Sequence, residues 1–214
     1  MTVRPLLCFV SDGSLPPDAG PSDLARTVEA IRRAIDAGID LVQVRERNLP
    51  DRRLLDLVQR AVAAARGGGA RVLVNERVDI ALAAGASGVH LRGDSIAASD
   101  ARALVPPSWL VGRSIHSAEE AAAPGVTAGC DYLVFGTVFQ TASKPAGHPV
   151  SGVAELRRVC GATSLPVLAI GGVTLERVPA VAAAGAAGIA AITLFGRTAP
   201  VADRVAAVRR LFDT

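Results

Sequence analysis

The segment GTVFQTASKPAGHP, residues 136–149, groups hydroxyl side chains around one lysine directly after the apolar run DYLVF. Thr137, Thr141, Ser143 and Lys144 could hold an anion there, because hydroxyl and ammonium groups donate hydrogen bonds to phosphate oxygens. An ordinary surface connection would need only turn residues, such as the glycines and prolines that the segment also contains. The composition of this segment therefore leaves both interpretations open.

A second candidate group is basic. Gln43, Arg45 and Arg47 alternate in VQVRER, so a strand would place their side chains on one face. Buried arginines are costly unless they are paired. They are expected either to pair with Glu76 and Asp94 or to bind the negative charge of a ligand.

The two carboxylates, Glu76 and Asp94, have a further interpretation. Together with water they could hold one Mg²⁺, a cation that prefers oxygen ligands. Such a metal would suit a diphosphate lying between the carboxylates and the arginines.

Two glycine-containing stretches, IGGVT (170–174) and AITLFG (191–196), follow apolar runs near the end of the chain. Backbone N–H groups around Gly171, Gly172, Ile192 and Thr193 could cradle a phosphate, because glycine allows close approach and a helix N-terminus favours anions. Thr174 would be the N-cap of the next helix. The alternative is that the glycines serve only a tight strand-to-helix turn.

The three histidines predict little on their own. His90, inside GVHL, is expected to be a core histidine, and His148 is expected to be solvated. His116 precedes a helix that Ser117 and Glu120 would begin as a capping box, so it could belong to a site at a strand end. No Ser/His/Asp order and no spaced pair of histidines is present.

These residues are carried by a regular alternation of apolar strands and amphipathic helices. The predicted strands are 6–11, 40–46, 71–76, 88–91, 110–115, 131–138, 166–172 and 188–195. The predicted helices are 22–37, 51–66, 77–84, 97–104, 117–123, 152–160, 175–184 and 199–212. Strands that are apolar on both faces belong to parallel sheets covered by helices, so eight such units predict a closed (β/α)₈ barrel. A doubly wound open sheet is the alternative, but SDGSLPP does not match its glycine-rich first turn.

Chemistry in a (β/α)₈ barrel gathers at the carboxyl ends of the strands. The sequence places polar side chains at most of those ends. The residues expected at the strand ends are Gln43, Arg45, Arg47, Asn75, Glu76, His90, Asp94, Arg113, Ser114, His116, Thr137, Gly171, Gly172, Ile192 and Thr193.

Composition limits the class of protein. A chain of 214 residues, 50% of them hydrophobic, predicts a single barrel domain over residues 1–214. A net charge of +3 without a basic block argues against a nucleic-acid partner. Three widely spaced cysteines indicate a reducing compartment rather than disulfides or zinc. The apolar stretch at the start is too short for a signal peptide, and residues 180–195 are too short for a membrane span, so a cytoplasmic protein is expected.

Six stretches together resemble the thiamine-phosphate synthase and thiazole tautomerase family, from the second predicted strand to the eighth. They are VQVRER, VNERVDIALAAGASGVHL, GRSIHSAEEA, DYLVFGTVFQTASK, PVLAIGGVT and AGAAGIAAITLF. The resemblance implies small phosphorylated substrates, a Mg²⁺ cofactor and a homodimer. In the synthase branch the substrates are a hydroxymethylpyrimidine diphosphate and a thiazole phosphate.

The resemblance also implies roles for individual residues. Gln43, Arg45, Arg47 and Asn75 match the positions that hold the pyrimidine and its diphosphate. Ser114 and His116 match the G-x-S-x-H motif, and Thr141, Ser143 and Lys144 match the segment that covers the diphosphate. Gly172, Ile192 and Thr193 match the phosphate-binding positions, and Glu76 matches a metal-binding aspartate.

Departures from the family pattern keep three functions open. The second metal-binding aspartate aligns with Ser95, one place after Asp94, which favours weaker metal binding. The tautomerase branch often lacks these carboxylates, but its catalytic histidine aligns with Thr137, which is no general base at neutral pH. We expect a synthase, with the tautomerase as the alternative and a non-catalytic binder of thiazole or thiamine phosphate as a third.

Overall fold

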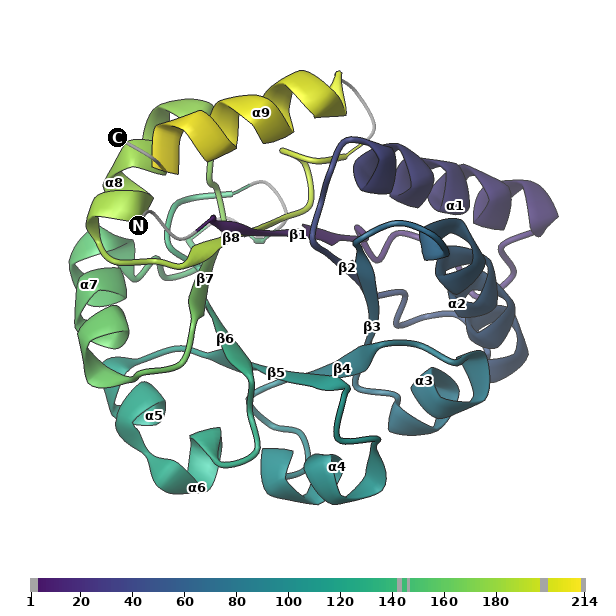
Figure 1. Cartoon of the computed structure of the whole chain (residues 1–214), viewed down its shortest axis with the longest axis horizontal. Coiled ribbons are helices and arrows are strands. Elements are labelled where there is room, and N and C mark those ends of the chain that lie inside the picture. Colours follow the sequence, from purple (N-terminus) through teal and green to yellow (C-terminus); the bar gives the residue numbers. More distant parts are fainter. Residues whose placement is uncertain (1–3, 142–143, 146, 197–199, 213–214) are drawn as a thin grey trace.

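The computed structural model describes residues 4–141, 144–145, 147–196 and 200–212. Eight parallel strands form a closed barrel in the order of the chain, with β1 paired to β8, and helices surround them (Figure 1). The strands are β1 (Leu6–Val10), β2 (Leu41–Val44), β3 (Arg71–Asn75), β4 (Gly88–Leu91), β5 (Leu110–Ile115), β6 (Tyr132–Phe135), β7 (Val167–Ile170) and β8 (Gly188–Ala191). This confirms the predicted (β/α)₈ barrel.

The helices occupy the predicted stretches with small changes. They are α1 (Pro21–Asp36), α2 (Asp51–Ala65), α3 (Val78–Ala84), α4 (Ala98–Leu104), α5 (Ala118–Ala122), α6 (Pro124–Thr127), α7 (Gly152–Ala162), α8 (Val178–Ala183) and α9 (Val201–Phe212). The predicted helix 175–184 is divided into a 3₁₀ turn, η1 (Leu175–Arg177), and α8. Among the described residues, no helix has the length and apolar character to cross a membrane.

Several strands are shorter than predicted, mainly because they end earlier on the carboxyl side. The strand β2 ends at Val44 rather than at residue 46, and β8 ends at Ala191 rather than at residue 195. After β8 the chain turns back on itself, with Gly196 N donating to Thr193 O at 3.3 Å. The apolar composition that suggested longer strands reflects burial of these loops, because Leu194 and Phe195 are buried without being in the sheet. Arg45, Thr137, Gly171 and Ile192 therefore lie in loops.

Two hydrophobic clusters fill the molecule. The larger one lies between the strands and the helices, and the smaller one fills the barrel with Cys8, Val10, Leu41, Leu73, Tyr132, Val134, Leu168 and Ala190. Side chains alternate between these clusters along each strand, as the pleat requires. Since the barrel interior is packed, ligands have access only to its ends.

Candidate active site

Four neighbouring strands carry a row of polar side chains inside the barrel. Gln43 on β2 donates a 2.9 Å hydrogen bond from Nε2 to Oδ1 of Asn75 on β3, and both side chains are buried. Asn75 pairs in register with His90 on β4. His90 Nε2 lies 2.9 Å from Oγ of Ser114 on β5. The structure thus brings together three predicted site residues and links them to a histidine that the sequence assigned to the core.

His90 is indeed buried, with 2% of its surface exposed. Its Nδ1 lies 3.0 Å from the hydroxyl of Tyr132, which projects into the same interior. Burial, with a smaller effect of Arg113, lowers the pKa of His90 to about 3, so the imidazole is neutral at pH 7. The link from His90 to Ser114 could not be read from the sequence, because it joins residues on different strands.

Arg45 stands at the mouth of the barrel against the β1–α1 loop. Its backbone N donates a 2.8 Å hydrogen bond to Oγ of Ser11. Its guanidinium lies so close to Gly13 that a Cβ at Gly13 would come within 2.9 Å of Nη1. The buried carboxylate of Glu46 accepts hydrogen bonds of 3.1 Å from the backbone N of Gly13 and of Leu15. Glu46 therefore holds the loop that forms one wall beside Arg45, a role the sequence analysis missed.

The charges that act most strongly on Arg45 are mainly positive. Burial lowers the pKa of Arg45, and the nearby Arg47 and Arg92 lower it further, while Glu46 has the opposite effect. Within the part of the chain that the structure describes, neither Arg45 nor Arg47 forms an ion pair with a carboxylate. The expected alternative of an ion-pair network between these arginines and Glu76 or Asp94 is therefore not found.

Both carboxylates instead contact Arg92. Its backbone N donates a 2.6 Å hydrogen bond to Oε1 of Glu76, and its guanidinium forms an ion pair with the exposed Asp94. Buried Arg113 holds the loop that contains Asp94 through 2.8 Å hydrogen bonds to the carbonyls of Gly93 and Ile96. The two predicted metal ligands are thus on adjacent loops, joined by an arginine that the sequence analysis did not include.

The described residues contain no group of three or more His, Cys, Asp or Glu side chains that could hold a metal ion. Mg²⁺ is commonly held by one or two carboxylates together with waters and phosphates of the substrate. Glu76 and Asp94 are carboxylates of the kind that such a site uses, but in this structure Asp94 is paired with Arg92. Metal binding by these two residues therefore stays a prediction.

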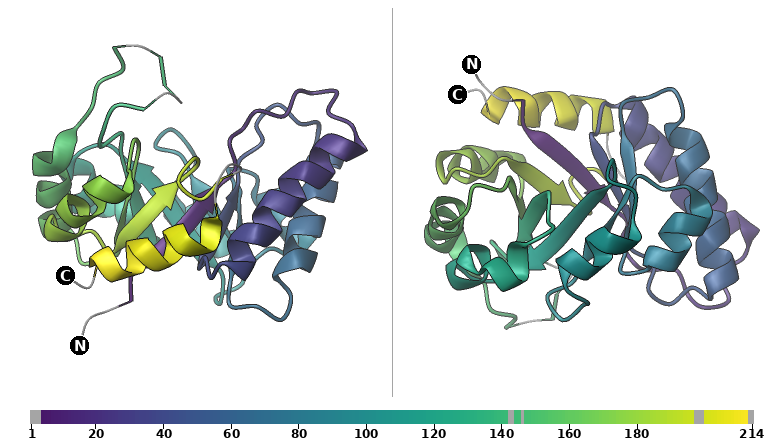
Figure 2. Two further views of the ribbon diagram at one scale, coloured as in Figure 1. Left: turned by 90° about the horizontal axis from the view of Figure 1, so that it is seen from above. Right: turned by 60° about the horizontal axis from the view of Figure 1, so that its bottom comes forward.

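The β6–α7 loop rises above the barrel on the side opposite the β1–α1 loop (Figure 2, left). At its base, Thr137 is buried, and His116 Nδ1 lies 2.8 Å from the carbonyl oxygen of Gly136. Further along, Lys144 is exposed and its backbone N donates to Thr141 O at 3.3 Å. Ser143 lies outside the described residues.

The β7–α8 turn packs beneath the start of this loop. Gly171 and Gly172 have φ values of 99° and 62°. A Cβ would come within 2.6 Å of Thr137 Cγ2 at Gly171 and within 2.3 Å of Gln140 O at Gly172. Only glycine suits these positions, as a tight strand-to-helix turn requires. This geometry is compatible with both interpretations of the glycines, so phosphate binding stays a prediction.

Ile192 and Thr193 follow β8 in the neighbouring turn. Ile192 is partly buried and Thr193 is exposed. Arg204 of α9 donates from Nη1 to the carbonyls of Thr193 and Leu194, at 3.3 and 3.2 Å. These hydrogen bonds hold the carbonyl groups of the turn against α9. That the backbone N–H groups of the turn bind a phosphate at the mouth stays a prediction.

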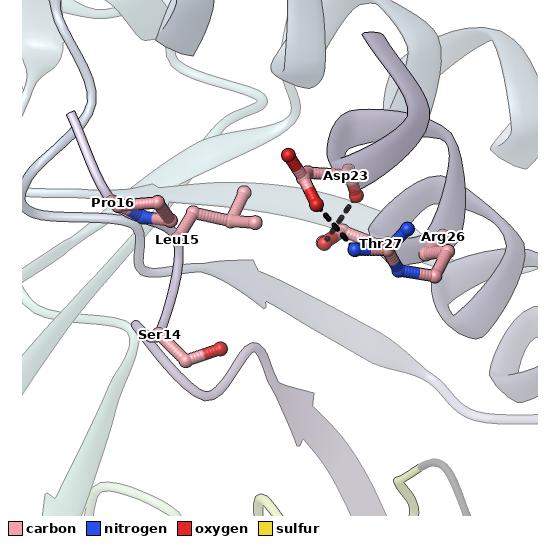
Figure 3. A pocket seen from close by; sticks show the side chains of 6 residues that line it. All are labelled: Ser14, Leu15, Pro16, Asp23, Arg26 and Thr27. Atoms are coloured by element: carbon pink, nitrogen blue, oxygen red, sulfur yellow. Dashed lines mark hydrogen bonds and ion pairs between the residues drawn. The ribbon is translucent and has the colours of Figure 1, made fainter. Parts of the chain in front are cut away.

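A cavity of about 230 Å³ lies beside the β1–α1 loop rather than at the predicted site (Figure 3). It is lined by Ser14, Leu15, Pro16, Asp23, Arg26 and Thr27. Asp23 and Arg26, both on α1, form an ion pair with each other. None of the predicted site residues lines this cavity. Because the predicted polar and basic residues gather at the barrel mouth, we place the candidate site there.

Known proteins match the chain along most of its length. A family model described as thiamine monophosphate synthase matches residues 9–195. A thiamine-phosphate synthase of Methanoculleus marisnigri is 38% identical over 207 residues, covering 97% of this chain and 93% of the relative. A putative thiamine-phosphate synthase of Geobacter sulfurreducens is 44% identical over 176 residues, covering 82% of this chain and 80% of the relative.

A solved structure agrees with these sequences. The thiamine phosphate pyrophosphorylase from Pyrococcus furiosus superimposes with a TM-score of 0.80 and 29% identity, covering 99% of this chain and 97% of that one. The family model, the relatives and this structure confirm the resemblance to thiamine-phosphate synthases, which are transferases of thiamine biosynthesis. The chain belongs to the thiamine monophosphate synthase family.

Proposed function

We propose that this chain is a thiamine-phosphate synthase, which couples hydroxymethylpyrimidine diphosphate to a thiazole phosphate and releases diphosphate. The observation that supports this most directly is the half-buried Arg45, which has no ion pair among the described residues and lies near the like charges of Arg47 and Arg92. Such a group is stabilised when an anion binds. The row of neutral polar side chains beside it suits the heterocycle that carries that anion.

Gln43 and Asn75 bind the pyrimidine in this proposal. Their mutual hydrogen bond fixes the orientation of both amides, so the remaining amide groups face the ligand in a defined pattern. Arg45 and Arg47 bind the diphosphate from one side of the mouth. Thr141, Ser143 and Lys144 cover it from the other side, on the β6–α7 loop.

The reaction breaks the bond between the pyrimidine methylene carbon and the diphosphate oxygen, and the electron pair leaves with diphosphate. The lone pair of the thiazole nitrogen then forms the new C–N bond. Arg45 and Lys144 stabilise the departing charge, and a closed loop excludes water that would trap the cation. Ser114 hydrogen-bonds to the bound diphosphate substrate at the mouth.

The thiazole phosphate is placed at the other side of the mouth. Backbone N–H groups of Gly171, Gly172, Ile192 and Thr193 bind its phosphate, as loops seven and eight do in many (β/α)₈ barrels. Thr137 and His116 lie at the base of the covering loop and shape this part of the mouth.

Magnesium is part of the proposal because the two carboxylates suit a substrate-bound metal ion. Glu76 and Asp94 would hold Mg²⁺ together with diphosphate oxygens, and the metal would neutralise part of the leaving group's charge. We also propose that the protein acts in the cytoplasm and forms a homodimer, as the family resemblance implied.

The tautomerase alternative has less support. Its catalytic base would stand at Thr137, whose hydroxyl does not act as a base at neutral pH. Here Thr137 is buried and packed against Gly171, which suits a structural side chain. No observation specifically favours a non-catalytic binder.

Lys144 offers a clear test because it is the only lysine in the sequence; the other residues of the 23 Lys and Arg are arginines. Purified protein with Mg²⁺ should convert the two substrates to thiamine phosphate and diphosphate. Lys144→Ala should lower kcat at least tenfold, and Lys144→Arg should not restore it, because guanidinium cannot replace a compact ammonium group. Arg52→Ala, an exposed charge on α2, is the matched control and should keep full activity.

The outcomes separate the three functions. Absence of synthase turnover together with conversion of the thiazole carboxylate tautomer would assign the tautomerase function. Binding of thiamine phosphate by calorimetry without either turnover would assign a regulatory function. Full synthase activity in Lys144→Ala would contradict the proposed role of Lys144 in stabilising the departing diphosphate.

A further inference from the structure

We infer that Tyr132, His90 and Ser114 form a hydrogen-bond chain of fixed direction that makes the Ser114 hydroxyl a donor toward the ligand. Tyr132 OH lies 3.0 Å from His90 Nδ1, and His90 Nε2 lies 2.9 Å from Ser114 Oγ. His90 and Tyr132 are positioning residues in this inference. It rests on the proposed function only for the identity of the ligand.

The direction is set at Tyr132, the inner end of the chain. Its side chain is buried at 2% exposure, and burial raises the pKa of its phenol well above the ordinary value, so the hydroxyl keeps its proton. Among the described residues, His90 Nδ1 is the one hydrogen-bond partner of this hydroxyl. If Nδ1 carried a proton, the phenol proton would be buried without an acceptor, which is costly. Tyr132 therefore donates and Nδ1 accepts.

The direction is then passed through the imidazole. A neutral histidine carries a single ring proton. Because Nδ1 accepts from Tyr132, that proton is on Nε2, which donates to Ser114 Oγ. The Ser114 oxygen is thus already an acceptor, and its own proton is left for another partner.

Ser114 is the outer end of the chain. It is only partly buried, one residue before the end of β5, in the polar row that ends at the mouth. Its hydroxyl therefore recognises a hydrogen-bond acceptor on the ligand, such as a phosphate oxygen or an unprotonated ring nitrogen. It is not arranged to accept a proton from the ligand, so Ser114 orients the substrate and does not act as a base.

Gly112 is what allows this chain to form. A Cβ at this position would lie 2.0 Å from the Tyr132 ring, so only glycine leaves room for the ring beneath His90. His90 and Gly112 are register partners on adjacent strands. Gly112 is also the register partner of Tyr132, so the sheet places the ring and the imidazole on either side of Gly112, and Ser114 lies two residues further along β5.

Nitrogen-15 NMR of histidine-labelled protein tests the direction without any assay of activity. The chain has three histidines, so a variant with His116→Asn and His148→Asn leaves only His90. The expected spectrum at pH 7 shows a protonated Nε2 and an unprotonated Nδ1. A proton on Nδ1, or on both nitrogens, would overturn the inference.

Kinetics test the consequence. Tyr132→Phe keeps the ring but removes the donor, so the tautomer preference of His90 should be lost and kcat/KM should fall about tenfold. Ser114→Ala should cost at least as much, and the double variant should be no worse than Ser114→Ala alone, because both act through one chain. Ser114→Thr, which keeps the hydroxyl, should recover part of the activity. If the fold-losses of kcat/KM in Tyr132→Phe and Ser114→Ala multiply in the double variant, the two residues act independently and the inference is overturned.

Failure of the proposed function gives a different pattern. If no synthase turnover is found, the NMR experiment still decides the direction of the chain. Calorimetric titration with inorganic diphosphate then replaces kcat/KM in the same set of variants. Weaker binding in Ser114→Ala with no added effect of Tyr132→Phe supports the chain, and independent effects overturn it.

Discussion

The guanidinium carbon of Arg177 lies 4.7 Å from the centre of the Phe139 ring, and Nη1 of the same side chain donates a 2.6 Å hydrogen bond to the carbonyl oxygen of Gly172. Phe139 N in turn donates to Gly171 O at 3.0 Å. Arg177 thus joins the base of the β6–α7 loop to the β7–α8 turn. The base of the covering loop and one of the two turns proposed to bind the thiazole phosphate are therefore held as one unit.

Replacing Arg177 by Met should loosen this unit. The cation–π contact and the hydrogen bond together contribute about 1 kcal/mol, which corresponds to a Tm decrease of roughly 2–4 °C in a chain of this size. The KM for the thiazole phosphate should rise several-fold. Arg157→Met is the control, since the hydrogen bond of that exposed arginine among the described residues is a long one, 3.4 Å from Nη2 to Ala183 O. An equal decrease of Tm and an equal rise of KM in both variants would contradict a specific role of Arg177 in joining the two loops.

Arg45→Gln should separate activity from stability. We expect kcat/KM to fall by about 100-fold because a charged contact to the leaving group is lost. The Tm should stay the same or rise, since the substitution relieves the burial of a cation near Arg47 and Arg92. Steady-state kinetics and calorimetry provide the two readings. A lower Tm with unchanged kinetics would make Arg45 a structural residue.

Glu46→Gln should weaken the wall beside Arg45. One amide oxygen can replace only one of the two carboxylate oxygens that accept from Gly13 N and Leu15 N. A buried N–H without an acceptor costs about 1–3 kcal/mol, which urea unfolding would detect. Glu29→Gln, an exposed change on α1, should leave the unfolding free energy within about 0.5 kcal/mol of the parent value.

Gly112→Ala should be among the most damaging single-methyl changes in the barrel. The added Cβ would overlap the Tyr132 ring at 2.0 Å, and overpacking of a core costs about 1–3 kcal/mol or more. Gly125→Ala on α6 is the comparison, because a Cβ there has no heavy atom within 4 Å. Thermal unfolding should show a large loss for the first variant and no loss for the second.

The ion pairs at the start of α3 should make a small, pH-dependent contribution. The pKa of Asp79 is lowered to about 2, first by its hydrogen bond from Arg77. A lowered folded-state pKa stabilises the protein above the unfolded value of 3.8, and this stabilisation is lost as the pH falls toward about 2. Asp79→Asn should therefore lower the Tm slightly at pH 7 and leave it unchanged near pH 2. Because Asp79 is largely exposed, high salt should reduce the difference at pH 7.

Much of the architecture could be predicted from the order of residues. Apolar β-branched runs separated by amphipathic helices are local patterns, and a parallel arrangement of eight strands closes in few ways. The same regularity placed Gln43, Asn75 and Ser114 at carboxyl ends of strands. Strand ends such as those of β2 and β8 were predicted too far along, since burial and sheet pairing give similar composition in a single sequence.

The partners of each side chain were decided only by the closed sheet. Register sets His90 beside Gly112 and Asn75, so the imidazole joins Tyr132 to Ser114, although these residues are far apart in the chain. The same closure brings Glu76 to the backbone of Arg92 and leaves Arg45 beside Gly13, whereas the Arg92–Asp94 ion pair is local to one loop. Residue types and their order thus determined the barrel and the chemical character of its mouth. The hydrogen bonds that join side chains of different strands depend on distances that exist only after the ring has closed.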